Sequence, residues 1–255
     1  MIVKLAATLR SFAAYAHSEG AALGALLAVT AGGLAFVAIA DTIMAPDGER
    51  FDTSVLEALH PGPDTTDPIG PDWLDHAMLD LTSLGSVAVL ATVALIIVGY
   101  LVFQKQRLQA ASLLLALAGG LMLSETMKQV FERSRPPEAY RVAEVLNASF
   151  PSGHALLSAV FYLTIGAMLA RAMKRRELKV YVIGVAIALT LIVGMTRVFL
   201  GVHWASDVLA GWCLGAAWAT ACWLMERTVV RMLRRAAPKE PDPESGSLIA
   251  PQGQE

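Results

Sequence analysis

Long uncharged apolar runs alternate with short polar segments along most of the chain. The first run, Ala22–Ala40, holds 19 residues, close to the ~20 that a helix needs to cross a bilayer. A lipid environment leaves helices and closed barrels as the structures that satisfy the backbone. The pattern therefore predicts an all-α integral membrane protein with a bundle of six transmembrane helices, whose five later spans are Ser83–Phe103, Ala110–Lys128, His154–Leu169, Val180–Met195 and Trp204–Leu224.

The segments between these runs differ in charge. Residues 41–82 form the longest, and positions 41–80 carry ten acidic residues against one basic residue, Arg50. Two amphipathic pieces in this loop, 51–60 and 71–81, predict short helices against the membrane surface. We expect residues 1–21 to form an interfacial segment and residues 22–225 the six-span domain. Residues 226–255 are expected to form a basic segment and then a disordered tail.

Composition supports a membrane protein. Of the 255 residues, 55% are hydrophobic and 16% are charged, and the mean hydropathy is +0.54. The net charge of −2 gives no reason to expect a nucleic-acid partner. Cys213 and Cys222 share one apolar run, and their setting predicts packing residues in preference to zinc ligands or a disulfide. In that run Gly211, Gly215 and Ala219 recur at every fourth position, which predicts close helix packing.

The Lys and Arg residues indicate which side each segment faces. Fourteen of the 20 fall in the N-terminus, 104–107, 171–179 and 227–239, and with six spans these four segments lie on one side. Such segments remain cytoplasmic. We expect a protein of the inner membrane with both termini in the cytoplasm. The acidic loop, residues 129–152 and the turn 197–203 should face the periplasm or exterior.

Three polar pieces meet this outer face. They are Lys128 with Arg135, the Pro-Ser-Gly-His sequence at 151–154, and the stretch 197–207. Each alone has a structural interpretation, as snorkelling cations, a capped helix start or a polar pair that closes a helix. Together they gather cations, histidines and a helix N-terminus at one membrane depth, where an unpartnered charge is costly and usually functional.

The last piece contains a candidate catalytic pair. His203 and Asp207 are four residues apart, so on a helix they share a face and can touch. A carboxylate beside an imidazole fixes its tautomer and stabilises its protonated form.

The combined set is suited to binding phosphate. Arg135 and Arg197 can each grip two phosphate oxygens, and Lys128 adds a point charge. Backbone N–H groups of residues 152–154 would point at the anion, aided by the helix dipole. Gly153 would let the ligand approach the backbone closely. A divalent metal held by the two histidines and the aspartate is the rival interpretation, which three adjacent cations disfavour.

Three further charges near these motifs need an interpretation. Glu125 lies three residues before Lys128, and a structural ion pair between them is favoured over a role in substrate choice. Arg133 and Arg141 are interpreted as ordinary loop charges in preference to contacts with a second phosphate.

The three pieces resemble the signature motifs of the type-2 phosphatidic acid phosphatase superfamily, which is related to vanadium haloperoxidases and bacterial acid phosphatases. The sequences KQVFERSRP, PSGH and TRVFLGVHWASD match the pattern Lys-x6-Arg-Pro, Pro-Ser-Gly-His and Ser-Arg-x5-His-x3-Asp. One position departs, because Thr196 stands where Ser is usual, and Thr keeps the hydroxyl. The resemblance covers about residues 22–225.

This resemblance implies a metal-independent lipid phosphatase or diphosphatase that needs no cofactor and works through a phosphohistidine. His203 would be the nucleophile, oriented by Asp207, and His154 the general acid. The phosphate would be held by Lys128, Arg135, Ser152, Gly153 and Arg197. Candidate substrates in the bilayer are phosphatidic acid, phosphatidylglycerophosphate, undecaprenyl diphosphate and phosphorylated lipid A, and the motifs favour none of them. They give no oligomeric state.

Two other functions are compatible with the same charged cluster. In a membrane carrier or channel, the charges would line an ion path and should occur at several depths. A non-catalytic protein that binds lipid phosphates would not need both histidines and the aspartate.

Overall fold

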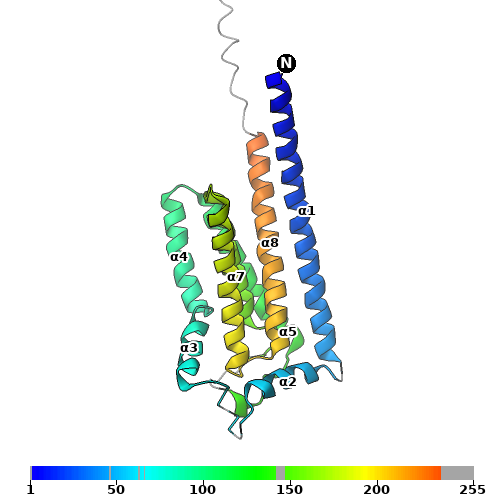
Figure 1. The fold of residues 1–255 in the computed structure, drawn as a ribbon, viewed down its shortest axis with the longest axis vertical. Coiled ribbons are helices and arrows are strands. Elements are labelled where there is room, and N and C mark those ends of the chain that lie inside the picture. Colours follow the sequence, from blue (N-terminus) through cyan, green and yellow to red (C-terminus); the bar gives the residue numbers. More distant parts are fainter. Residues whose placement is uncertain (1, 46, 63, 66, 142–146, 237–255) are drawn as a thin grey trace, which may run out of the picture.

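The computed structural model describes residues 2–45, 47–62, 64–65, 67–141 and 147–236, with the backbone alone for residues 2–18 and 234. Every regular element in this part of the chain is helical (Figure 1). The all-α prediction is therefore confirmed. The helices are α1 (Ile2–Met44), α2 (Glu49–Leu59), α3 (Asp72–Ser83), α4 (Val87–Phe103), α5 (Arg107–Phe131), the 3-10 turn η1 (Glu138–Tyr140), α6 (Gly153–Ala172), α7 (Arg176–Phe199) and α8 (Ala205–Ala236).

Five helices are long and apolar enough to cross a membrane: α1 over Glu19–Met44, α5, α6, α7, and α8 over Ala205–Leu233. A sixth span results if α3 and α4, which meet at a bend of 47°, count as one. The predicted second span began at Ser83, and the structure places the bend there. The side chain of Ser86 accepts a hydrogen bond from the Val89 N–H at 3.3 Å and caps α4 after the bend.

Helix α6 lies inside the bundle and packs against α5, α7 and α8. Its buried face, with Leu156 and Val160, meets residues of α4, α5 and α8 in one apolar cluster. Gly211 and Gly215 of α8 lie against the α6 backbone, where a side chain would collide with the carbonyls of Ser152 and Leu156. The predicted close packing at these glycines is confirmed.

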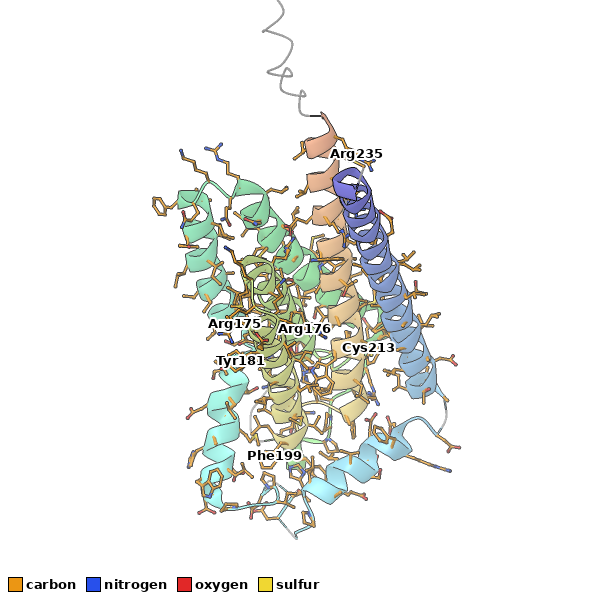
Figure 2. The ribbon with its side chains drawn as sticks, turned by 45° about the horizontal axis from the view of Figure 1, so that its top comes forward. Arg175, Arg176, Tyr181, Phe199, Cys213 and Arg235 are labelled. Atoms are coloured by element: carbon orange, nitrogen blue, oxygen red, sulfur yellow. The ribbon has the colours of Figure 1, made fainter. Side chains whose placement is uncertain are left out.

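The two ends of the bundle differ. The start of α1 and the end of α8 lie at one end, and α2 and α3 lie at the other (Figure 1). Phe199, which ends α7, lies by α2 and α3, whereas Arg235 lies at the far end of α8 (Figure 2). Phe199, Leu200 and Val202 pack against apolar residues of α2 and α3. This cluster attaches the two short helices to the turn between α7 and α8.

Two helices extend beyond the predicted spans. The predicted interfacial segment 1–21 is not separated from the first span, because residues 2–44 form one continuous helix. The basic segment after the sixth span is also helical, since α8 runs to Ala236. The predicted disordered tail lies outside the described residues from 237 onward.

Candidate active site

The first polar piece is shaped by the end of α5. Lys128 lies in the last helical turn. Glu132 then adopts the left-handed conformation (φ 42°, ψ 29°) and ends the helix. Pro136 disfavours helical geometry at Arg135, so the chain crosses the site as an irregular segment that places the guanidinium of Arg135 beside His203.

The second piece begins α6. Gly153 and His154 occupy its first turn, where backbone N–H groups lack partners within the helix. A methyl group on Gly153 would lie 3.3 Å from the Ser124 hydroxyl and 3.5 Å from the Lys128 ammonium. The Ser152 N–H differs from the expectation, because it donates to the Asp207 carbonyl at 3.0 Å and is not free for an anion.

The third piece is the turn from α7 to α8. Arg197 lies in the last turn of α7, and Gly201 reverses the chain with φ 63°. A side chain at Gly201 would collide with the carbonyl of Tyr140. His203 follows in the turn and Asp207 lies in the first turn of α8, so both are held at its N-terminal end.

One cavity of about 190 Å³ collects most of the predicted residues. Asp207 and Ser152 are fully buried and do not line it. The other six candidates all line its wall: Lys128, Arg135, Gly153, His154, Arg197 and His203.

The neighbours of His203 define its tautomer. Arg135 Nη1 lies 3.1 Å from His203 Nε2. Because arginine can only donate, Nε2 must accept and so carries the lone pair. The proton then resides on Nδ1, which lies 3.4 Å from Asp207 Oδ2 and 3.3 Å from the Ser149 hydroxyl.

The site environment keeps His203 neutral. Burial lowers the pKa of His203 to about 4, although the Asp207 hydrogen bond and charge act to raise it. Arg135 and Arg197 reinforce the lowering. Burial also lowers the pKa of Arg135 to about 10, which leaves its guanidinium charged at neutral pH. A buried neutral imidazole therefore sits among positive charges.

The three cations are held by different partners. Arg135 donates to the Asn147 side chain at 2.6 Å and to the Val202 carbonyl at 2.6 Å. Arg197 donates to Thr82 of α3 at 2.9 Å. Lys128 makes the predicted ion pair with Glu125 at 3.1 Å. Each charge is thus fixed at the cavity wall.

Several polar atoms around the cavity are unused. In the described part of the protein, Ser124 Oγ, Ser152 Oγ and Arg197 Nε are buried without a hydrogen-bond partner. Ser124 was missed from the sequence because a single serine in an apolar helix gives no signal. Ser124 and Arg197 line the cavity, so these two unused donors are suited to an oxyanion, whereas Ser152 does not line it.

The interpretation of Arg133 as an ordinary loop charge is wrong. Its side chain is 10% exposed and forms ion pairs with Asp52 at 2.7 Å and Asp207 at 2.6 Å. Its guanidinium also lies 5.6 Å from the centre of the Trp204 ring. Arg141 also differs, because its Nε donates to the Pro136 carbonyl at 2.6 Å and braces the loop. Sequence spacing could not reveal partners so distant along the chain.

For metal binding, the geometry gives no support to the rival interpretation. Within the described ranges, no three His, Cys, Asp or Glu side chains converge as a set of metal ligands. Cys213 and Cys222 are free thiols. They pack in two different apolar clusters, as predicted.

Comparison with known proteins gives two similar sequences. Phosphatidylglycerophosphatase B of Bacillus subtilis is 34% identical over 146 residues, which cover 56% of this chain and 70% of that protein. An undecaprenyl-diphosphatase of Sulfolobus acidocaldarius is 30% identical over 121 residues, which cover 46% of this chain and 54% of that protein.

Solved structures agree with this relationship. The transmembrane PAP2-type phosphatidylglycerolphosphate phosphatase of Bacillus subtilis superposes with a TM-score of 0.72 and 26% identity, over 79% of this chain and 96% of the other. Aquifex aeolicus LpxE shares the fold, with a TM-score of 0.51 and 20% identity, over 69% of this chain and 94% of the other.

The family comparison points the same way. Residues 109–231, which contain all three polar pieces, match the PAP2 superfamily. The helical fold, the motif spacing and the identity to the Bacillus protein lead to one conclusion: the chain belongs to the PAP2 superfamily.

Proposed function

We propose that this protein is an integral-membrane lipid phosphatase that acts through a phosphohistidine. The observation that carries this proposal is the environment of His203. Its Nε2 lone pair lies at a cavity lined by three cations, and its Nδ1 faces the buried Asp207. A neutral imidazole with this orientation is an activated nucleophile for a phosphate bound among those cations.

In the first step, His203 Nε2 attacks phosphorus and forms an N–P bond while the bond from phosphorus to the lipid oxygen breaks. Asp207 stabilises the positive charge that develops on the ring. His154 donates a proton to the leaving oxygen. In the second step, His154 takes a proton from water, the water oxygen attacks phosphorus, the N–P bond breaks and phosphate is released.

The bound phosphate would be stabilised by groups already in place. Lys128, Arg135 and Arg197 supply positive charge, and the first turn of α6 supplies N–H groups. Ser124, which lines the cavity, adds a hydroxyl donor. This preorganised charge is the main requirement of phosphoryl transfer, so we propose that the reaction needs no metal ion.

The cavity continues into an apolar groove, which supports a lipid substrate. The groove, of about 130 Å³, lies between α4 and α5 and is floored by Leu157 of α6. Val87, Leu121 and Leu157 line both the cavity and the groove. A hydrocarbon chain in the groove would leave its phosphate in the cavity. Both a lipid monophosphate such as phosphatidylglycerophosphate and a polyprenyl diphosphate have this form.

An ion path is less well supported. Away from the cavity, the partly exposed Arg171 forms an ion pair with the buried Glu226 at the opposite end of α6 and α8. Between the cavity and this ion pair lies the apolar cluster of α4, α5, α6 and α8. A path for ions should not be interrupted by such a cluster.

Phosphate release from a panel of lipid phosphates tests the proposal. The purified protein should release phosphate from at least one of phosphatidic acid, phosphatidylglycerophosphate and undecaprenyl diphosphate, with a chelator present. His203→Ala should abolish release, and Asp207→Asn should leave a small remnant. His76→Ala, a histidine of α3 outside the cavity, is the matched control and should retain activity. Turnover by His203→Ala near the wild-type rate would contradict the proposal.

A further inference from the structure

Asp52 is unusual among the acidic residues that precede α4. It lies on α2 and is 1% exposed. Its neighbour Asp47, by contrast, forms an exposed pair with Arg50 at 2.9 Å. A buried carboxylate is costly unless hydrogen bonds and opposite charge compensate for lost hydration. The partners of Asp52 should therefore show why it is buried.

Those partners lead directly to Asp207. Asp52 Oδ2 accepts from Arg133 Nη2 at 2.7 Å, and the other nitrogen of the same guanidinium, Nη1, donates to Asp207 Oδ1 at 2.6 Å. The planar fork of arginine thus joins the two buried carboxylates. Because Asp52 holds Arg133 in place, Asp207 Oδ1 is hydrogen-bonded to Arg133 and does not face His203.

The second oxygen of Asp207 is thereby left for the catalytic side. Asp207 Oδ2 accepts from the Ser149 hydroxyl and from the Trp204 N–H at 3.0 Å, and it is the oxygen that faces His203 Nδ1. A carboxylate free to rotate would exchange its oxygens. The Arg133 contact prevents this exchange.

Asp52 also holds the helix that carries Asp207. Its Oδ1 accepts from the Ser206 N–H at 2.8 Å, and its Oδ2 accepts from the Ser206 hydroxyl. The Ser206 N–H belongs to the first turn of α8, where N–H groups need an outside acceptor. Asp52 serves as that acceptor from a helix more than 150 residues earlier.

We infer that Asp52 is a positioning residue of the active site, which fixes the Asp207 carboxylate through Arg133 and through the first turn of α8. The inference rests on the proposed function, in which Asp207 supports His203. It makes α2 part of the catalytic machinery, although the three family motifs lie far from α2 in sequence. Asp52 does not line the cavity in which the phosphate would bind.

The test compares Asp52→Asn with Asp47→Asn, which removes the same charge from the exposed pair. If Asp52 has a positioning role, the kcat of Asp52→Asn should be lower than that of the wild type by roughly 10- to 100-fold. This is the loss of rate expected when one charge-assisted hydrogen bond is removed. KM should stay within about twofold, because the phosphate-binding groups are untouched. Asp47→Asn should match the wild type in both constants. A kcat of Asp52→Asn within about twofold of the wild type, or an equal fall in both variants, would overturn the inference.

If Asp52→Asn does not fold, a second variant tests the same contact. Arg133→Lys keeps a positive charge between the carboxylates but loses the fork, so its kcat should fall while KM is kept. An unchanged kcat would overturn the inference. In an Arg133→Gln background, Asp52→Asn should cost much less than in the wild type, because the two act through one contact. Fully additive losses would also contradict it.

Phosphate release by the wild type and by His203→Ala distinguishes failure of the proposed function from failure of the positioning role. If neither releases phosphate from any lipid, the proposed function fails. Nitrogen NMR of histidine-labelled protein then decides the positioning role. The His203 signal, identified by its loss in His203→Ala, should move in Asp52→Asn and stay in place in Asp47→Asn. A signal unmoved in both would refute the role of Asp52.

Discussion

At the scale of single residues, two neighbours define the chemical state of His203. Arg135 requires a lone pair on Nε2, and Asp207 attracts the proton on Nδ1. The same arginine belongs to the proposed phosphate site. In the proposed mechanism, Arg135 would therefore both bind the phosphate and direct the His203 lone pair toward it.

The first prediction concerns the protonation of His203. The fold lowers its pKa to about 4 from the ordinary 6.5, chiefly by burial. At a pH between these two pKa values, the imidazole of His203 therefore binds a proton more readily in the unfolded chain than in the folded protein. The free energy of unfolding should then decrease as pH falls through that interval. At about pH 5.5, between the two values, nitrogen NMR should show the neutral Nδ1–H tautomer of His203. An imidazolium signal at that pH would contradict this assignment.

The second prediction concerns the space at Gly153. A methyl group there would crowd Ser124 and Lys128 and displace the phosphate, so Gly153→Ala should lower kcat/KM on the order of 10- to 100-fold. Gly184→Ala is the control, because a methyl group at that position of α7 meets no atom within 4 Å. Equal activity of the two variants in the phosphate-release assay would show that the close approach is not needed.

Much of the site could be predicted at this scale, for a physical reason. Cations, histidines and an aspartate are rare in apolar runs, so Lys128, Arg197 and His203 stand out in the sequence. Arg133 and Asp52 stand in polar segments where charge is ordinary. Their pairing depends on how α2 folds back on α8, which no local spacing encodes.

At the scale of elements, the groove between α4 and α5 adjoins the cavity, and in the proposed function it would receive the hydrocarbon chain of the lipid. The bend between α3 and α4 starts at its mouth, where Val87 begins α4 and lines both groove and cavity. In the proposed function, the polar cavity would carry the chemistry and the apolar groove would bind the hydrocarbon chain.

This separation gives the third prediction. Ala118→Trp fills the groove and should lower kcat/KM for a long-chain lipid phosphate by about tenfold or more, since one lost methylene contact is worth about 1–3 kcal/mol. Hydrolysis of a short-chain, water-soluble phosphate ester should remain within about twofold, because it depends on groups that the substitution does not touch. Ala31→Trp, at an exposed position of α1, is the matched control. Equal losses on both substrates would argue against a chain in the groove.

Helix existence could be predicted, because uncharged runs of spanning length admit few alternatives in lipid. Helix boundaries could not. The runs do not reveal that α1 continues unbroken from Ile2, or that α8 continues to Ala236, because charged residues at a helix end continue a helix as readily as they end it.

At the scale of the whole molecule, the site lies at the end of the bundle opposite the start of α1 and the end of α8 (Figure 1). The basic segments 171–179 and 227–235 lie at the ends of spans away from the motifs. Since basic segments remain in the cytoplasm, we propose that the site opens to the periplasm or exterior of the inner membrane and releases phosphate there.

The fourth prediction tests this topology. After replacement of Cys213 and Cys222, single cysteines are placed at Ala139 of η1 and Glu177 of α7, both exposed positions. A membrane-impermeant thiol reagent added to intact cells should label position 139 and spare position 177, and permeabilised cells should show both labelled. Labelling of position 177 alone in intact cells would invert the topology.

The most direct test of the central claim is to trap the phosphorylated enzyme. The protein is mixed with a substrate carrying radiolabelled phosphate, quenched rapidly in base and separated by gel electrophoresis. A phosphohistidine should appear as label that survives base and is lost in acid, in the wild type but not in His203→Ala. The account would be contradicted if His203→Ala retained this acid-labile label. It would also be contradicted if the label were absent from wild-type protein that hydrolyses the substrate under conditions where the attack of water is rate-limiting.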